Sequence, residues 1–135
     1  MVGPLILVVD DTRDSRELFV EFLRMAGFQA EQAATGAEAL DKAAALRPSA
    51  IVMDLEMPEM DGWEATRRLK ADERTCSIPV VALSAHVMEG ARMKAIEAGC
   101  MGFLPKPCYP SQVSEELNRI LGMTAPSASG RTRLE

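Results

Sequence analysis

Three aspartates, one serine and one lysine each stand at or just after the end of a short apolar run, and together they could serve one kind of chemistry. They are Asp10, Asp11, Asp54, Ser84 and Lys106. A carboxylate beside a buried segment is costly unless a nearby group stabilises its charge. Several carboxylates in one crevice would also repel each other unless a cation neutralised them. Ligation by oxygen atoms alone, without His or Cys, suits a hard divalent ion such as Mg²⁺.

The same residues could handle a phosphoryl group. Phosphoryl transfer depends on positioning and charge neutralisation more than on covalent machinery, and Lys106 and Ser84 opposite a metal would complete a cradle for the phosphoryl oxygens. One carboxylate can also act as the nucleophile and form an aspartyl phosphate, and we interpret Asp54 as that nucleophile. Taken singly, each residue has an ordinary role as a helix cap, a turn residue or a solvated charge. Only their joint placement favours a site.

Composition and charge exclude several other classes of protein. The chain has 135 residues, of which 47% are hydrophobic, so it suits one compact domain. Its net charge of −5 and lack of a basic cluster argue against a surface for nucleic acid. No apolar run approaches the roughly 18 residues of a membrane span, and the N-terminus lacks the basic start of a signal peptide. Three cysteines without CxxC spacing indicate reduced thiols in a cytoplasmic protein: Cys76, Cys100 and Cys108.

Short apolar runs alternate with amphipathic segments along the chain. The expected strands span about 5–9, 28–34, 50–53, 79–83 and 102–104, and the expected helices span about 15–26, 35–47, 63–72, 89–99 and 110–121. This order predicts an α/β fold with a parallel sheet covered on both faces by helices. Crossovers between parallel strands are right-handed, so an open, doubly wound sheet follows. In such sheets the ligand site lies beyond the carboxyl ends of the strands, where the five residues above stand.

Local signals indicate several of the element boundaries. Gly27 stands where a C-terminal cap belongs, and Thr35 and Glu38 have the spacing of a capping box. Pro110 suits the first position of a helix. The pair Asp61-Gly62 is interpreted as a turn after the third strand.

We expect residues 1–122 to form one domain. Residues 123–135 are small, polar and aperiodic, and are expected to be a disordered tail, a linker remnant or a cloning scar. No DNA-binding domain is expected to follow residue 121, so the output should be protein–protein binding or should depend on a further domain.

The chain resembles a response-regulator receiver domain, the phosphoacceptor part of two-component signalling. The resemblance covers about Leu5 to Leu121, and its motifs are VVDD at 8–11, MDLEMPEMDG at 53–62, ALSA at 82–85 and LPKP at 104–107. Each motif is weak alone, but the four in this order at the strand ends are specific. The resemblance implies a flavodoxin-like (βα)5 fold with the strand order 2-1-3-4-5, an order taken from the family.

The resemblance also implies a role for each residue of the site. Asp54 would accept the phosphoryl group from a phosphohistidine. Asp11, Asp54 and the backbone carbonyl of Glu56 would bind Mg²⁺, with Asp10 contributing through a water molecule. Lys106 would pair with Asp54 and then with the phosphoryl oxygens. The side chain of Glu56 is a departure from the family pattern: it puts an acid beside the phosphoryl site, and we expect it to affect the rate of dephosphorylation.

Two further residues would transmit the signal. Ser84 would hydrogen-bond the phosphoryl group and draw its loop inward, and Phe103 would rotate inward when Ser84 moves. The Lys106–Pro107 peptide bond is expected to be cis, in keeping with the restriction of cis bonds to proline.

The implied partners are a sensor histidine kinase or a histidine phosphotransfer protein, and a downstream protein bound through the surface of the fourth and fifth helices and the fifth strand. No nucleic acid or membrane partner is expected. The chain would assist its own phosphorylation and dephosphorylation without being an enzyme for a separate substrate. Two alternatives are an interaction module that works without phosphorylation and a phosphatase of the haloacid-dehalogenase type. The phosphatase needs DxD[TV] after its first strand, whereas this chain has VVDDTRD, which leaves Asp54 unexplained.

Overall fold

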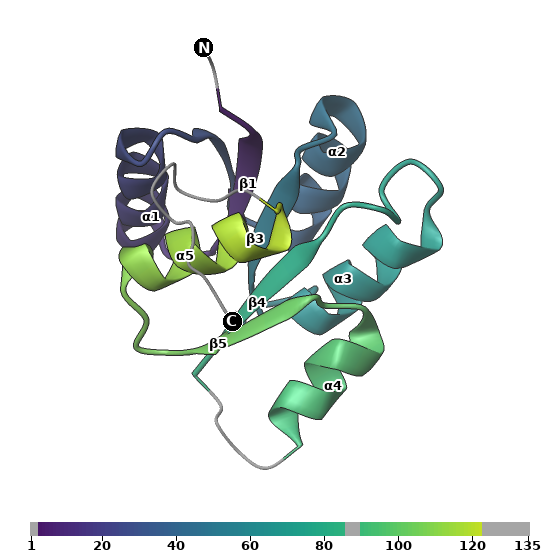
Figure 1. Cartoon of the computed structure of the whole chain (residues 1–135). Helices are drawn as coiled ribbons and strands as arrows, with labels where there is room; N and C mark the ends of the chain where they lie inside the picture. The colour runs from purple at the N-terminus through teal and green to yellow at the C-terminus, as the bar shows by residue number, and fades with distance from the viewer. Residues whose placement is uncertain (1–2, 86–89, 123–135) are drawn as a thin grey trace.

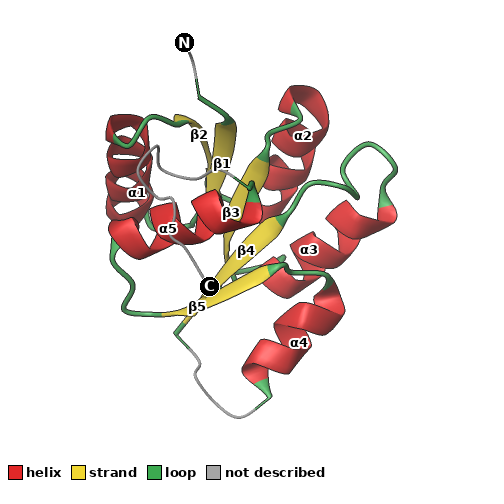
Figure 2. Cartoon of the chain, viewed as in Figure 1, coloured by secondary structure: helices red, strands yellow, loops and turns green. Residues whose placement is uncertain are grey.

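The computed structural model describes residues 3–85 and 90–122, and these residues form five strands and five helices in strict alternation (Figures 1 and 2). The strands are β1 (Leu5–Val9), β2 (Gln29–Ala33), β3 (Ala50–Asp54), β4 (Val80–Ser84) and β5 (Gly102–Pro105). The helices are α1 (Arg13–Met25), α2 (Gly36–Leu46), α3 (Gly62–Ala71), α4 (Ala91–Ala98) and α5 (Pro110–Ile120). The predicted tail at 123–135 and the first residue of the predicted fourth helix lie outside the described residues.

The five strands form one parallel sheet in the order β2-β1-β3-β4-β5. This order confirms the predicted doubly wound, flavodoxin-like architecture. Strand β2 lies on one side of β1 in the sheet, and β3, β4 and β5 follow in order on its other side. The order therefore reverses between β1 and β3, and this is where a ligand site is expected in an open α/β sheet.

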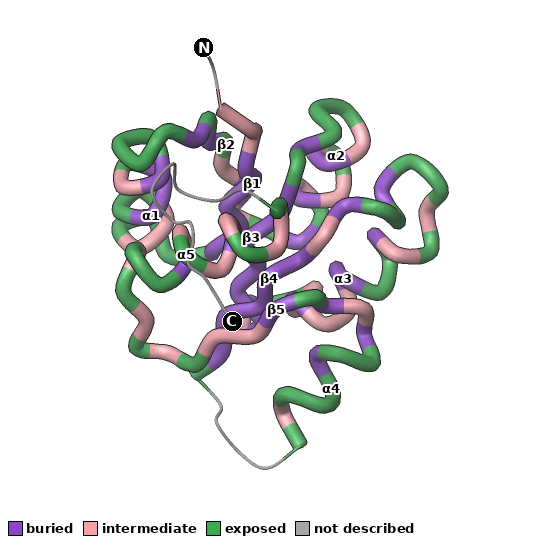
Figure 3. Tube along the Cα trace, viewed as in Figure 1, coloured by how far each residue is buried: buried purple, intermediate pink, exposed green. Residues whose placement is uncertain are grey.

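Two layers of helices cover the sheet, with α1 and α5 on one face and α2, α3 and α4 on the other (Figure 1). The strand β1 shows how both faces are buried. Ile6 and Val8 pack in the core under α1 and α5, whereas Leu7 and Val9 pack in the core under α2 and α3. All four side chains are at most 1% exposed, and Figure 3 shows the central strands as buried throughout. A continuous apolar run of this kind is what a strand covered on both faces requires.

The helix ends follow the predicted signals in most places. Thr35 is the N-cap of α2, and its hydroxyl accepts the N–H of Glu38 at 3.0 Å. The Glu38 carboxylate reaches back to the N–H of Ala34, at 2.7 Å, one residue earlier than in a standard capping box. Gly27 follows α1 with a φ of +102°, in the left-handed region that glycine adopts without strain.

One local prediction was wrong. Asp61 does not simply form a turn with Gly62: it is the N-cap of α3, and its carboxylate accepts the N–H of Glu64 at 2.9 Å. The cap therefore begins the helix one residue earlier than the predicted start at Trp63. At the end of α2, Arg47 takes the left-handed C-cap position with a φ of 49°, so the helix ends before Pro48 without a glycine.

Candidate functional site

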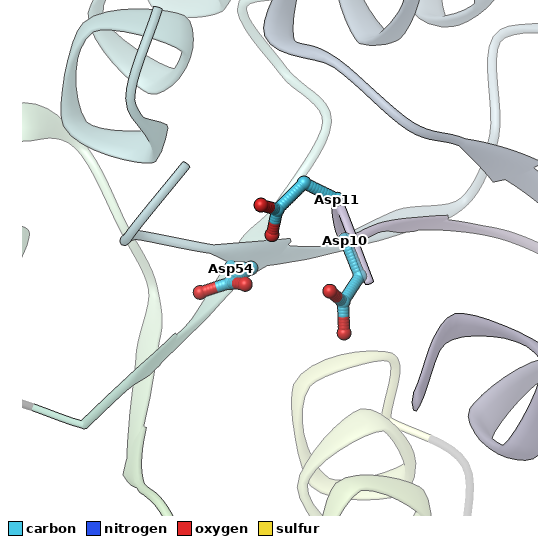
Figure 4. Close-up of side chains that lie close together, drawn as sticks. All are labelled: Asp10, Asp11 and Asp54. Atoms are coloured by element: carbon cyan, nitrogen blue, oxygen red, sulfur yellow. The ribbon is translucent and has the colours of Figure 1, made fainter. Parts of the chain in front are cut away.

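The register of the sheet brings three aspartates to one edge. Val9 pairs with Met53 across β1 and β3, so Asp10 and Asp54, the next residue in each segment, lie at the same level. Asp10 and Asp54 are 4% and 3% exposed, whereas Asp11 is exposed. One carboxylate oxygen from each aspartate lies within 4.8 Å of those of the other two, and Figure 4 shows the three side chains grouped where β1 and β3 end.

The backbone around Asp10 fixes its carboxylate. Its Oδ1 accepts the N–H of Thr12 at 2.8 Å, and its carbonyl oxygen accepts Nη1 of Arg16 at 2.9 Å. The N–H of Asp10 donates to the carbonyl of Ala33 at 3.1 Å, beyond the last pair of the β1–β2 ladder. Thr12 is the N-cap residue of α1. Neither Asp10 nor Asp11 therefore occupies the capping position, which was the ordinary alternative for both.

Lys106 reaches Asp54 from the loop between β5 and α5. Its Nζ lies 3.0 Å from Oδ1 of Asp54, and the backbone N–H of Glu56 donates to the same oxygen at 3.1 Å. The backbone N–H of Lys106 donates to the carbonyl of Ser84 at 2.7 Å, which ties the loop to the end of β4. The peptide bond between Lys106 and Pro107 is cis.

Burial and charge act against each other on the Asp54–Lys106 pair. Burial raises the pKa of Asp54, aided by the charge of Asp10, and it outweighs the opposing hydrogen bonds from Lys106 and Glu56. Burial alone would lower the pKa of Lys106, but the hydrogen bond and charge of Asp54, with smaller effects of Asp10 and Glu56, raise it. Both pKa values are raised because the two side chains differ in exposure. The Asp54 side chain is 4% exposed, so burial dominates its pKa, whereas that of Lys106 is 32% exposed, so the attraction of Asp54 dominates. Asp54 is therefore a carboxylate whose charge the surrounding protein only partly compensates.

Ser84 and Glu56 are joined across the ends of β4 and β3. The Ser84 hydroxyl, on a fully buried residue, donates to Oε2 of Glu56 at 2.5 Å. The backbone N–H of Ala85 donates to the other carboxylate oxygen, Oε1, at 2.8 Å. The sequence placed Glu56 beside the site without predicting these contacts. The only signal for them is that Glu56 follows Asp54 by two residues and has a side chain long enough to reach the next strand.

Phe103 lies on the same face of the sheet as Ser84. It pairs with Ala82 in the β4–β5 register and packs, partly buried, against the core under α3 and α4. Ser84 follows Ala82 by two residues, and residues two apart on a strand point to the same face. The structure therefore places the two residues expected to transmit the signal on one side of the sheet.

The donor set fits a hard divalent cation. Its ligand atoms would all be oxygens, from the carboxylates of Asp10, Asp11 and Asp54. Two of these carboxyl groups are buried close together, and among the described residues the ammonium of Lys106 is the cation that forms an ion pair with one of them. Mg²⁺ prefers such ligands and tolerates a site that is partly open to water, which the exposure of Asp11 provides. The backbone carbonyl of Glu56 lies in the loop that directly follows Asp54, the last residue of β3.

A groove of about 390 Å³ opens beside the aspartates, on the side of α1. Asp10 and Lys106 line it, together with the apolar side chains of Leu18, Phe19 and Pro107. Another hollow of about 400 Å³ lies between α2 and α3 and includes none of the site residues. The groove beside Asp10 and Lys106 is therefore a hollow, among the described residues, that two of the site residues line.

Comparisons with known proteins agree with this arrangement. The family model described as "Response regulator receiver domain" matches residues 6–118. Among curated proteins, the polar-differentiation response regulators DivK of Brucella anthropi and Brucella abortus are each 32% identical over 117 residues, covering 87% of this chain and 95% of theirs. No described helix has the length and apolar character needed to cross a membrane.

Solved structures extend the likeness to three dimensions. The chemotaxis protein CheY4 of Vibrio cholerae superposes with a TM-score of 0.83 at 29% identity, covering 88% of this chain and 99% of CheY4. The receiver domain of the sensor histidine kinase PA1611 from Pseudomonas aeruginosa has a TM-score of 0.82 at 32% identity, covering 90% of this chain and 99% of that domain. That structure has a magnesium ion coordinated in its active site cleft. The family match and these relatives show that the chain belongs to the response-regulator receiver domains of two-component signalling.

Proposed function

We propose that this receiver domain accepts a phosphoryl group on Asp54, in a reaction that depends on Mg²⁺, and that the modification switches its binding to a target protein. The observation that carries this proposal is the position of Asp54. Its carboxylate is 3% exposed, lies in the group of three aspartates and accepts Lys106 at 3.0 Å. A buried carboxylate whose charge is incompletely compensated is costly to the fold, and such groups are concentrated at functional sites.

The proposed donor is a phosphohistidine of a histidine kinase or of a phosphotransfer protein. A carboxylate oxygen of Asp54 attacks phosphorus, the P–N bond to the histidine breaks, and the imidazole leaves with the electron pair and takes a proton from water. Lys106 then pairs with the phosphoryl oxygens as well as with Asp54, so its charge offsets that of the transferring group. We assign the approach of the donor side chain to the side of α1, where a groove is lined by Asp10 and Lys106.

The metal site would use Asp10, Asp11, Asp54 and the backbone carbonyl of Glu56. When bound, Mg²⁺ supplies positive charge next to the carboxylates and the phosphoryl oxygens. The protein contributes the fixed orientation of its ligands: Asp10 is held by the N–H of Thr12, and Asp54 by the N–H of Glu56. The magnesium ion in the cleft of the PA1611 receiver domain supports the same assignment here.

The proposed switch runs from Ser84 to Phe103 and on to the surface formed by α4, β5 and α5. That surface includes two exposed apolar side chains of α4, Met93 and Ile96, which are 58% and 52% exposed and stand three residues apart on the helix. Clustered exposed apolar side chains often mark a binding surface. Phosphorylation would favour the target only to the extent that the target binds the switched conformation more tightly.

Intact-mass spectrometry after incubation with acetyl phosphate and MgCl₂ tests the proposal. We expect the wild-type chain to gain the mass of one phosphoryl group, and the gain to disappear in Asp54→Asn and in EDTA. Asp41→Asn, which changes an exposed acid on α2, is the matched control and should be labelled like the wild type. Labelling that persists in Asp54→Asn would contradict the assignment of the phosphoacceptor.

The same experiment separates the two alternative functions. A chain that gains no phosphoryl group from acetyl phosphate or from a histidine kinase would be an interaction module that works without phosphorylation. Continuous release of phosphate from a small phosphate ester would indicate a phosphatase of the haloacid-dehalogenase type.

A further inference from the structure

We propose that the carboxylate of Glu56 is an internal competitor of the phosphoryl group, because it binds two hydrogen-bond donors that the group on Asp54 would need. The inference rests on the proposed function, since it concerns a phosphoryl group bonded to Asp54. It assigns to the Glu56 side chain a positioning role in the phosphorylation equilibrium, separate from that of its backbone carbonyl.

Glu56 is bound at both of its carboxylate oxygens. Oε2 accepts the Ser84 hydroxyl at 2.5 Å, and Oε1 accepts the Ala85 N–H at 2.8 Å. Both donors stand at the end of β4, and the carboxylate reaches them from the loop that follows β3. Hydrogen bonds to a charged acceptor are stronger than neutral ones, so this contact stabilises the arrangement that the chain has before phosphorylation.

In the proposed function the Ser84 hydroxyl at the end of β4 binds the phosphoryl group on Asp54, so that group and Glu56 would use the same donor. Asp54 pairs with Leu83 across β3 and β4, so Ser84, the last residue of β4, and Ala85, which follows the strand, come directly after that paired residue. A phosphoryl group brings three strongly accepting oxygens. Lys106 lies on one side of Asp54, at 3.0 Å from Oδ1. Any phosphoryl oxygen that turns toward β4 meets donors already bound to Glu56.

Charge prevents the two anions from sharing these donors. A phosphoryl group carries a charge of about −1.5 to −2 near pH 7, and the Glu56 carboxylate beside it would be repelled. Glu56 is only partly buried, so its side chain can turn toward solvent when it is displaced. Phosphorylation therefore has to replace the Glu56 contacts with its own, and Glu56 shifts the equilibrium toward the unphosphorylated chain.

Binding of beryllofluoride, a stable analogue of the phosphoryl group, measures this competition directly. The titration is done by isothermal calorimetry in saturating MgCl₂ after the Mg²⁺ affinity of each variant has been measured. We expect Glu56→Gln to bind beryllofluoride about tenfold more tightly, the change expected from losing one or two charge-assisted hydrogen bonds. Glu59→Gln is the matched control: it removes the same charge from an exposed position of the same loop and should stay within about twofold of the wild type.

Glu56→Asp distinguishes competition for donors from simple charge repulsion. Aspartate keeps the charge but is one methylene shorter, so it cannot hold the Ser84 hydroxyl and the Ala85 N–H in the same way. If Glu56 acts by occupying these donors, Glu56→Asp will also bind the analogue more tightly than the wild type. If Glu56→Gln binds more tightly and Glu56→Asp matches the wild type, repulsion alone explains the effect and the competition is ruled out.

The remaining outcomes separate this inference from the proposed function. Equal or weaker binding by a folded Glu56→Gln variant, while the wild type binds beryllofluoride and is labelled by acetyl phosphate, overturns the inference alone. A wild-type chain that neither binds the analogue nor gains a phosphoryl group overturns the proposed function as well. Thermal unfolding of each variant before titration shows that it is folded, and Glu56→Asp supplies a second test if Glu56→Gln is not.

Discussion

The ammonium of Lys106 lies 3.0 Å from the carboxylate of Asp54, although 52 positions separate the two residues in the chain. The carboxylate is almost fully buried, whereas the ammonium is partly exposed to water. The pair is therefore asymmetric: without its partner, Lys106 can be solvated, but Asp54 cannot. Removing one partner of a buried charge pair usually costs more than the pair itself contributes, because the other charge is left unpaired.

A double-mutant cycle measures this asymmetry. We expect Lys106→Met to lower the free energy of unfolding at neutral pH by roughly 1 kcal/mol, a modest value because Lys106 is partly solvated. In an Asp54→Asn background the same substitution should cost little, since no buried carboxylate remains. Urea unfolding of the wild type, both single variants and the double variant gives the coupling. Equal costs of Lys106→Met in both backgrounds would show that the lysine acts through packing.

The pH dependence of the free energy of unfolding should show that the ionised carboxylate of Asp54 is unfavourable in the folded chain. Burial raises the pKa of Asp54 in the folded chain, so folding disfavours its ionised form. Protonated Asp54 is tolerated better in the folded chain than ionised Asp54. Its contribution to stability is therefore fully present below the pKa of the unfolded chain, about 3.9, and is lost as the pH rises through the raised pKa of the folded chain. We therefore expect Asp54→Asn, which is always neutral, to be more stable than the wild type near pH 7 by roughly 1 kcal/mol.

The advantage of Asp54→Asn should disappear below about pH 4, where the wild-type carboxyl is protonated in both states. Thermal unfolding at several pH values in EDTA checks this, with Asp41→Asn as the control for loss of a surface acid. A wild-type chain more stable than Asp54→Asn at pH 7 in EDTA would mean that Lys106 and the Glu56 amide fully compensate the buried charge.

Addition of Mg²⁺ should raise the unfolding temperature, and the rise should depend on Asp11. A ligand that binds only the folded state stabilises it by about 2.7 kcal/mol at 100 times its dissociation constant. Asp11 is exposed, so Asp11→Ala removes a carboxylate without disturbing the core. We expect this variant to need at least tenfold more MgCl₂ for the same stabilisation. Asp14→Ala removes an exposed acid from the first turn of α1 and should respond to Mg²⁺ like the wild type.

The sheet was predictable because its strands are buried on both faces. Runs such as Leu5–Val9 are apolar throughout, and no other element type of that length explains them. The placement of Asp10 and Asp54 followed from the same pattern, since the carboxyl ends of parallel strands share one edge. Contacts fixed by side-chain rotamers were not predictable. No periodicity of the sequence shows that Glu56, in the loop after β3, reaches Ser84 at the end of the neighbouring strand β4.

The error at Asp61 also has a physical cause, and Arg47 shows a local feature for which nothing was predicted. Asp61 was interpreted as part of a turn because Asp-Gly pairs favour turns, but the same carboxylate can accept an N–H from the first turn of a helix. Arg47 takes a left-handed conformation that the sequence alone assigns to glycine or asparagine.

The last prediction concerns Gly62, where the backbone of the site approaches α3. A Cβ on Gly62 would overlap the carbonyl oxygen of Asp54 and would lie 2.7 Å from Cα of Leu55. The N–H of Gly62 also donates to the carbonyl of Leu55 at 3.1 Å. Both obstacles are backbone atoms, which cannot move without shifting Asp54. We expect Gly62→Ala to cost about 1–3 kcal/mol of stability, the usual cost of overpacking, and to slow labelling by acetyl phosphate.

Gly36→Ala is the matched control, because Gly36 is also the first residue of a helix and is also crowded. There the three atoms nearest to the Cβ would all belong to the side chain of Met60, with its sulfur at 2.9 Å. Methionine is flexible and can adapt to one added methyl group, and alanine favours the helix. We expect Gly36→Ala to change stability by less than about 1 kcal/mol and to leave the labelling rate unchanged. If the two variants lost stability and labelling equally, crowding at α3 would be unrelated to the position of Asp54, and the site would be held by the sheet alone.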